Sequence, residues 1–232
     1  MPTPAPRLDF RALIRRLARH HGRPPASSVT DPFALILREQ VAYLATDARR
    51  EAAFRALRAR VGLTPSAIAH AKPATLRTIA RLGGAIAPEL RAERMQRSAE
   101  LVLRKWSGDL RRALALPLEA ARKALGAFPM IGEPGADRIL ATCGAARLVP
   151  LDSNALRVVT RLGLVKDARD YRTWYRSARV VTVPPPRTST GWGVEAGQLL
   201  RQHGQLVCKA RAPRCTACPL RPDCPTGRAV PL

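Results

Sequence analysis

Four cysteines near the end of the chain limit its possible folds and functions more than any other feature. Cys208, Cys215, Cys218 and Cys224 fall within seventeen positions, with six, two and five residues between them. Thiolates are soft ligands, and four of them from one short segment can hold a tetrahedral Zn²⁺ or a [4Fe-4S] cluster. Zinc sites often combine two CxxC-like pairs, whereas this segment winds around one centre. The spacing favours a [4Fe-4S] cluster, and Zn²⁺ and structural disulfides are the alternatives.

The net charge indicates a polyanionic partner. The 232 residues carry a formal charge of +23, and such a field attracts nucleic acid because each neutralised phosphate releases counterions. A membrane surface is the competing polyanion, but no apolar run approaches the roughly 20 residues of a spanning helix. The opening MPTPAPRLDF lacks the apolar core of a secretory signal. Clustered thiols without a signal indicate a reducing compartment, so we expect a cytoplasmic protein.

Prolines, glycines and capping residues divide the chain into short helical segments. Apolar residues recur at helical spacing between these breaks, and alternation typical of a strand is confined to Val180 to Val183. The expected helices span 8–22, 32–60 with a break near 45–47, 64–71, 73–82, 88–106, 117–126 and 136–143. The sequence therefore predicts an almost all-α protein built from many short helices.

A glycine-containing turn follows the segment 117–126. Phe128-Pro129-Met130-Ile131-Gly132-Glu133-Pro134-Gly135-Ala136 has the form apolar-Pro-x-apolar-Gly-x-x-x-Ala of a helix-hairpin-helix turn. Such a turn aims backbone N–H groups and a helix N-terminus at one point, where they can hold a phosphate oxygen. A hairpin in an ordinary helical bundle needs similar turn chemistry. The turn therefore predicts either DNA binding, through Met130, Gly132 and Gly135, or plain helix packing.

One aspartate stands directly before a further helix. Asp152 precedes a segment whose apolar face is formed by Leu156, Val159 and Leu162. Aspartate is a favoured residue at this position because its carboxylate accepts a hydrogen bond from the first helical turn. The sequence predicts a helix cap at Asp152, a role that is compatible with catalysis.

The order and separation of these features resemble the endonuclease III branch of the helix-hairpin-helix DNA glycosylase superfamily. Asp152 follows Gly132 by twenty residues and precedes the first cysteine by fifty-six, and the cysteine gaps match the [4Fe-4S] loop of this branch. Supporting matches are Pro32-Phe33-Ala34-Leu35, Ala45-Thr46-Asp47, and Leu200 to Cys208 with His203-Gly204. The likeness extends from about residue 30 to 225.

The resemblance implies an all-α, two-lobed protein. A six-helix barrel lobe would span 33–145, and a second lobe of 1–32 with 146–232 would carry the cluster. Double-stranded DNA with a damaged or mismatched base would bind a monomer across the groove between the lobes, with the base flipped out. Asp152 matches the family's aspartate, which stabilises the oxocarbenium character of the sugar or activates the attacking nucleophile.

The sequence departs from this family at the catalytic lysine. Bifunctional members place a lysine two residues after the second hairpin glycine, and its amine forms a Schiff base with the sugar. Counting from Gly132, this position is Pro134, which has no primary amine. We therefore expect a monofunctional glycosylase that uses water. The alternatives are a catalytically silent DNA-binding relative and a lyase that uses a displaced amine such as Lys123.

Other departures affect contacts with DNA and the base. Met130 stands where the hairpin commonly has glycine, and Ala42-Tyr43-Leu44 replaces the family's Ser-Ala-Gln, so that Tyr43 becomes a candidate for base stacking. The related adenine glycosylase uses a glutamate on the helix that starts near Pro32 to protonate the leaving purine. The matching position is Gln40, and the neighbouring Glu39 is our general-acid candidate.

Basic residues flank the cysteine segment. The resemblance places this loop near the DNA backbone, where cations position the protein on the duplex. The candidates for this contact are Arg201, Lys209, Arg211, Arg214 and Arg221.

Overall fold

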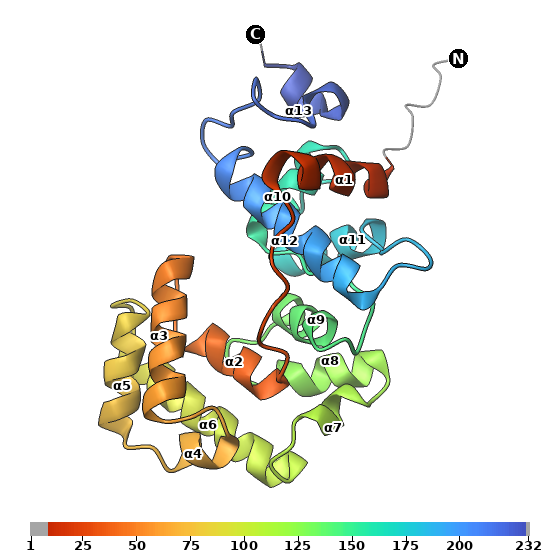
Figure 1. Ribbon diagram of the computed structural model, residues 1–232. Helices are drawn as coiled ribbons and strands as arrows, with labels where there is room; N and C mark the ends of the chain where they lie inside the picture. Colours follow the sequence, from red (N-terminus) through yellow and green to blue (C-terminus); the bar gives the residue numbers. More distant parts are fainter. Residues whose placement is uncertain (1–8, 231–232) are drawn as a thin grey trace. The chain divides into compact units, whose positions relative to one another are not determined.

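The computed structural model describes residues 9–230, which fold into helices joined by short loops (Figure 1). No strand occurs within that range, so the prediction of an all-α protein is confirmed. Residue 8 of the expected first helix lies outside the described residues. Contacts divide the chain into two compact units, one of 27–145 and one of 1–26 together with 146–232.

Eight helices form the unit of 27–145. Their starts follow local chemistry: Asp31, Thr46 and Thr64 each accept a hydrogen bond from a backbone N–H of the first turn, and proline occupies the first turn of several helices. The helices are α2 (Pro32–Gln40), α3 (Asp47–Arg60), α4 (Pro65–Ala69), α5 (Pro73–Leu82), α6 (Pro88–Trp106), α7 (Arg111–Leu114), α8 (Leu118–Gly126) and α9 (Glu133–Thr142).

The long helix α6 packs against α2, α4 and α5 (Figure 1). Met95, Ala99 and Val102 lie three and four residues apart on its face and are fully buried. Arg91, one turn earlier, is also buried, and its guanidinium donates to backbone carbonyls in two loops, including that of Val41 at 2.8 Å. The buried guanidinium of Arg91 therefore links the loop after α2 to the loop after α5.

The other unit is built around α12 (Thr190–Leu206), which packs against α10 (Ser153–Arg161) and α1 (Phe10–His21) (Figure 1). Its core combines leucines of α1 and α12 with the apolar face of α10. The remaining helices are α11 (Tyr171–Val181), a single 3₁₀ turn at Arg221–Asp223 and α13 (Pro225–Arg228).

Three glycines let α12 approach the segment that contains Asp152. A Cβ atom on Gly193, Gly197 or Gly204 would lie 2.0, 2.3 or 2.6 Å from the carbonyl oxygens of Leu148, Pro150 and Asn154, respectively. No side chain fits at such distances. The glycines therefore fix the position of residues 148–154 against α12.

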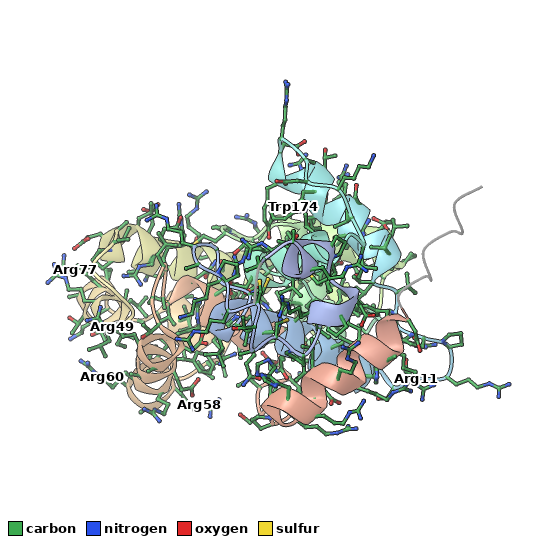
Figure 2. All side chains as sticks on the ribbon, turned by 90° about the horizontal axis from the view of Figure 1, so that it is seen from above. Arg11, Arg49, Arg58, Arg60, Arg77 and Trp174 are labelled. Atoms are coloured by element: carbon green, nitrogen blue, oxygen red, sulfur yellow. The ribbon has the colours of Figure 1, made fainter. Side chains whose placement is uncertain are left out.

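Arginines cover the outer faces of the helices. Figure 2 shows Arg49, Arg58 and Arg60 of α3 and Arg77 of α5 pointing away from the ribbon, and all four are exposed. Arg58 also lies over the ring of Phe54, 5.3 Å from its centroid. In the described part of the chain, no helix combines the length and the apolar character needed to cross a membrane.

Candidate functional site

The hairpin turn between α8 and α9 contains a left-handed residue. Ile131 N donates to Phe128 O at 3.1 Å, and the two central residues of this turn are Pro129 and Met130. Met130 has φ of 68°, a conformation that glycine adopts readily and that other residues adopt with strain. The glycine that is common at this position is therefore explained by the turn, and Met130 keeps the turn at a cost in stability.

Met130→Gly is expected to give a more stable protein than Met130→Ala. Both substitutions remove the methionine side chain, but only glycine relieves the left-handed strain, which is worth about 1 kcal/mol. Urea unfolding of the two variants measures this difference. Equal midpoints, or a more stable alanine variant, would show that the turn is not strained in solution.

The N-terminus of α9 is open. Gly132 is its exposed N-cap residue with an ordinary φ of −86°, and a Cβ there would meet only Pro134 Cδ, at 3.7 Å. The fold itself thus tolerates a side chain at Gly132, and glycine keeps the space over the helix N-terminus clear. The helix begins at Glu133, three residues before the expected start at Ala136, because proline is well suited to a first turn.

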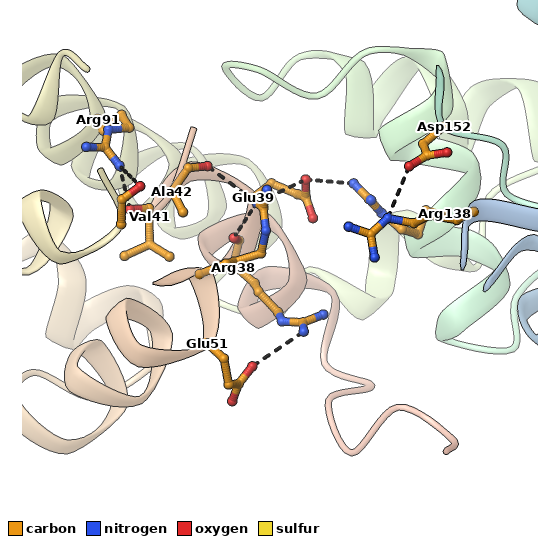
Figure 3. A network of polar contacts seen from close by, with 11 residues as sticks. Arg38, Glu39, Val41, Ala42, Glu51, Arg91, Arg138 and Asp152 are labelled. Atoms are coloured by element: carbon orange, nitrogen blue, oxygen red, sulfur yellow. Dashed lines mark hydrogen bonds and ion pairs between the residues drawn. The ribbon is translucent and has the colours of Figure 1, made fainter. Parts of the chain in front are cut away.

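Helix α2 braces the hairpin through two adjacent residues. Gln40 is fully buried and donates from Nε2 to Pro129 O at 2.9 Å and to Ser98 Oγ at 2.8 Å. Glu39 Oε2 lies 2.7 Å from Arg138 Nη2 of α9 and 3.8 Å from Arg50 Nη1 of α3 (Figure 3). Gln40 therefore has a structural role here, and Glu39, with two cationic partners, stays a prediction as a general acid.

The two helices of the hairpin are joined by a buried ion pair. Arg122 of α8 donates from Nε to Asp137 of α9, and both side chains are almost completely buried. A pair of this kind holds its partners in one geometry, since breaking it leaves a buried charge. Lys123, the next residue, is exposed on α8, and Pro134 lies in the first turn of α9.

The loop after α2 exposes apolar side chains. Tyr43 and Leu44 are 44% and 79% exposed, and Leu44 has a positive φ of 47°. Arg91 donates to the carbonyl of Val41, two residues before Tyr43. This hydrogen bond anchors the backbone that carries the two exposed side chains. The side chain of Tyr43 is therefore partly accessible, and its stacking on a base stays a prediction.

The carboxylate of Asp152 is held by three donors. Its Oδ1 accepts from Ala155 N at 2.9 Å and caps α10, so the predicted cap is confirmed. Its Oδ2 accepts from Asn154 Nδ2 at 3.2 Å and from Arg201 Nε at 3.1 Å. The side chain is 29% exposed. Asp152 is thus a carboxyl group held in one orientation, with its side chain partly exposed.

A chain of hydrogen bonds links Asp152 to the cysteine segment. Arg157 Nη2 donates to Asn154 Oδ1 at 2.9 Å, and Arg157 Nε donates to the carbonyl of Cys208 at 2.8 Å. Asn154 in turn donates to Asp152. Sequence reasoning missed Asn154 and Arg157; the only signal was their spacing of three on α10, which puts them on one helix face.

The four cysteines of the segment are free, and Cys224 lies in the core of the unit of 1–26 and 146–232, with Cys208 and Cys218 packed against it. Burial raises the pKa of Cys218 and Cys224, and the other thiols of the segment raise both further. The sulfurs also meet polar partners: Gly227 N donates to Cys224 Sγ at 3.3 Å, and Arg161 Nη1 lies 3.5 Å from Cys208 Sγ. The same donors would compensate the negative charge on sulfur if the segment bound a cluster through thiolates. Within residues 9–230, however, no group of three or more His, Cys, Asp or Glu side chains is arranged so that it could hold a metal ion.

Two histidines connect α1 to the same cysteine segment. His21 Nε2 lies 3.0 Å from His203 Nδ1, and His203 Nε2 lies 3.4 Å from Cys218 Sγ. Burial, followed by the neighbouring histidines, lowers the pKa of His203 to about 4. A neutral imidazole has one donor and one acceptor nitrogen. His203 can therefore donate to Cys218 Sγ while it accepts from His21.

The basic residues around the segment separate into two groups. Arg201 pairs with Asp152, and Arg221 donates to the carbonyls of Gly227 and Val230, so both side chains make contacts within the unit. Arg211 and Arg214 are exposed, whereas Lys209 is half-buried. The expected contact of this loop with a DNA backbone therefore narrows to Arg211 and Arg214, with a smaller part for Lys209.

The chain is similar in sequence and in fold to proteins of known function. It is 30% identical over 193 residues to endonuclease III of Sulfolobus acidocaldarius, covering 83% of this chain and 81% of that protein. It is 28% identical over 151 residues to a thymine/uracil-DNA glycosylase of Pyrobaculum aerophilum, covering 61% and 63%. A solved structure of a trapped covalent intermediate of endonuclease III with DNA matches with TM-score 0.74 and 20% identity, over 94% of this chain and 95% of that one. No family model matches.

Proposed function

Because the chain belongs to the endonuclease III family of DNA glycosylases, we propose that it removes a damaged or mismatched base from double-stranded DNA by hydrolysis and leaves an abasic site. The predicted family and the predicted helix-hairpin-helix glycosylase fold are confirmed by the sequence and fold matches. Such an enzyme acts in base excision repair, and we expect it to work as a monomer in the cytoplasm, where bacterial chromosomal DNA lies.

The observation that carries this proposal is the fixed carboxylate of Asp152. Its three hydrogen bonds orient both oxygens, and it stays partly accessible. As the glycosidic bond breaks, the sugar gains positive charge, and a preoriented carboxylate stabilises this charge without reorganisation. The same carboxylate can accept a proton from the attacking water as the new C–O bond forms.

The DNA backbone would be held by backbone donors and exposed cations. The open N-terminus of α9 at Gly132 suits a phosphate oxygen, and Gly135 lies in the first turn of the same helix. Arg211 and Arg214 supply charge on the other unit. A [4Fe-4S] cluster would be bound by Cys208, Cys215, Cys218 and Cys224, and its contribution would be to hold this loop in shape.

Pro134 supports hydrolysis rather than lyase chemistry. We expect no borohydride-trapped complex between the wild-type protein and abasic DNA, because position 134 has no primary amine to form a Schiff base. Pro134→Lys restores the amine at the family's position, and we expect trapping to appear in that variant. Denaturing gels of radiolabelled abasic duplex measure the adduct. Trapping by the wild type that disappears in Lys123→Ala would instead assign a lyase with a displaced amine.

A panel of lesion duplexes tests the proposed activity. Uracil and thymine opposite guanine are tested first, because the Pyrobaculum relative is named for these bases. Thymine glycol, 8-oxoguanine paired with adenine, and 3-methyladenine complete the panel. Strand breaks that require hot alkali indicate a monofunctional glycosylase and identify its substrate.

A catalytically silent DNA-binding relative is the second candidate. The observation that favours it is that both oxygens of Asp152 already accept hydrogen bonds, one of them from a guanidinium. This candidate predicts tight binding to lesion DNA without base release from any duplex of the panel. The lesion panel, together with a binding titration on the same duplexes, separates the two functions.

A further inference from the structure

The three donors to Asp152 differ in where they come from. Ala155 N and Asn154 Nδ2 belong to the same short segment as Asp152 itself, and they follow it wherever α10 moves. Arg201 comes from α12, forty-nine residues later in the chain. It is therefore the one contact among these three that ties the carboxylate to a second helix.

We propose that Arg201 is a positioning residue for the reaction, fixing the rotation of the Asp152 carboxylate so that one oxygen faces the substrate sugar. This inference rests on the proposed glycosylase function. Arg201 acts through Asp152 and need not touch DNA. Its charge also keeps the carboxylate paired while no substrate is bound.

The packing of α12 explains why this contact can be rigid. Gly197 and Gly204 bring the helix backbone against Pro150 and Asn154, on either side of Asp152. The donor is Nε, which lies closer to the backbone than the terminal nitrogens do and has less freedom to move. The close packing of α12 and the short reach of the Nε donor together allow little rotation of the Asp152 carboxylate.

The same features distinguish this contact from an ordinary surface ion pair. Exposed pairs contribute little because both side chains move and solvent screens them. Here Arg201 and Asp152 are 38% and 29% exposed, and the second oxygen of Asp152 is held by a backbone N–H. A guanidinium bound to a carboxylate that is already immobilised loses less entropy on pairing.

Arg201→Gln is expected to lower the single-turnover rate of base release roughly tenfold to hundredfold, which corresponds to the loss of one charged hydrogen bond. The affinity for lesion DNA is expected to change less than about threefold. The assay uses the cluster-containing protein in saturating excess over DNA, so that binding does not limit the rate. Arg172→Gln is the matched control: it removes the same charge from an exposed site on α11 in the same unit, and we expect it to leave the saturated rate unchanged.

An unchanged rate in Arg201→Gln would overturn the inference, as would a rate that falls only in proportion to weaker binding. A double-mutant cycle in thermal unfolding tests the contact without any substrate. Arg201→Gln, Asp152→Asn and the double variant should show coupling, because each single change breaks the same pair. If the wild type releases no base but the cycle shows coupling, the proposed function fails and the contact stands. If the wild type is active, Arg201→Gln keeps the wild-type rate and the cycle shows no coupling, then the positioning role of Arg201 is wrong while the proposed function stands.

Discussion

Asp152→Asn is expected to reduce base excision by at least about a hundredfold while DNA binding and the fold persist. The substitution removes the negative charge that stabilises the sugar in the transition state, an effect commonly worth two or more orders of magnitude. The helix should survive because asparagine is as good an N-cap as aspartate, and its carbonyl can still accept from Ala155 N. Single-turnover excision and a binding titration on one duplex measure the two effects separately.

The chain offers a matched control for this variant. Asp170 caps α11 in the same unit, with its Oδ1 accepting from Thr173 N at 2.9 Å. Asp170→Asn makes the same chemical change at another helix cap, and we expect nearly wild-type excision. An active Asp152→Asn enzyme would mean that another group assists departure of the base. Equal losses in both variants would point to a general effect of charge on binding.

Under the proposed [4Fe-4S] assignment, Cys215→Ser is expected to remove the iron, the sulfide and the brown colour that the cluster gives the protein, and to weaken DNA binding as well. Serine is a poor ligand for a soft metal centre, so the loop would lose the cluster that holds its shape. Binding would then lose the contributions of Arg211 and Arg214, and the slope of log affinity against log salt should fall by about one to two. Metal analysis, visible absorption and salt-dependent titrations give the three measurements.

Cys143 provides the control for the cysteine prediction. It lies in the unit of 27–145, apart from the quartet in sequence, and burial raises its pKa to about 12, so its thiol is inert at neutral pH. Cys143→Ser should therefore keep the metal and the colour. Zinc in place of iron in the wild type would assign the alternative metal. A colourless, folded Cys215→Ser with unchanged DNA affinity would refute the role of the loop in binding.

Helix positions were largely predictable because short-range chemistry decides them. Pro32, Pro73 and Pro88 each open a helix where expected, and Asp31 and Asp152 cap the helices that follow them. Proline and capping side chains act within one turn of their own position, so the relevant partners are visible in the sequence. The predicted start of α9 at Ala136 is three residues too late, because Pro134 fits a turn as well as the first turn of a helix.

The sequence by itself determined the all-α class, the hairpin, the cap at Asp152 and the family, since each depends on neighbouring residues or on fixed spacings. Only the tertiary structure decided that Arg201 binds Asp152 and that Arg91 joins two loops. It also showed why Gly197 and Gly204 are needed, because their close contacts lie with Pro150 and Asn154. These partners are separated by tens of residues, and in a chain so rich in arginine nothing local marks which guanidinium meets which carboxylate or carbonyl.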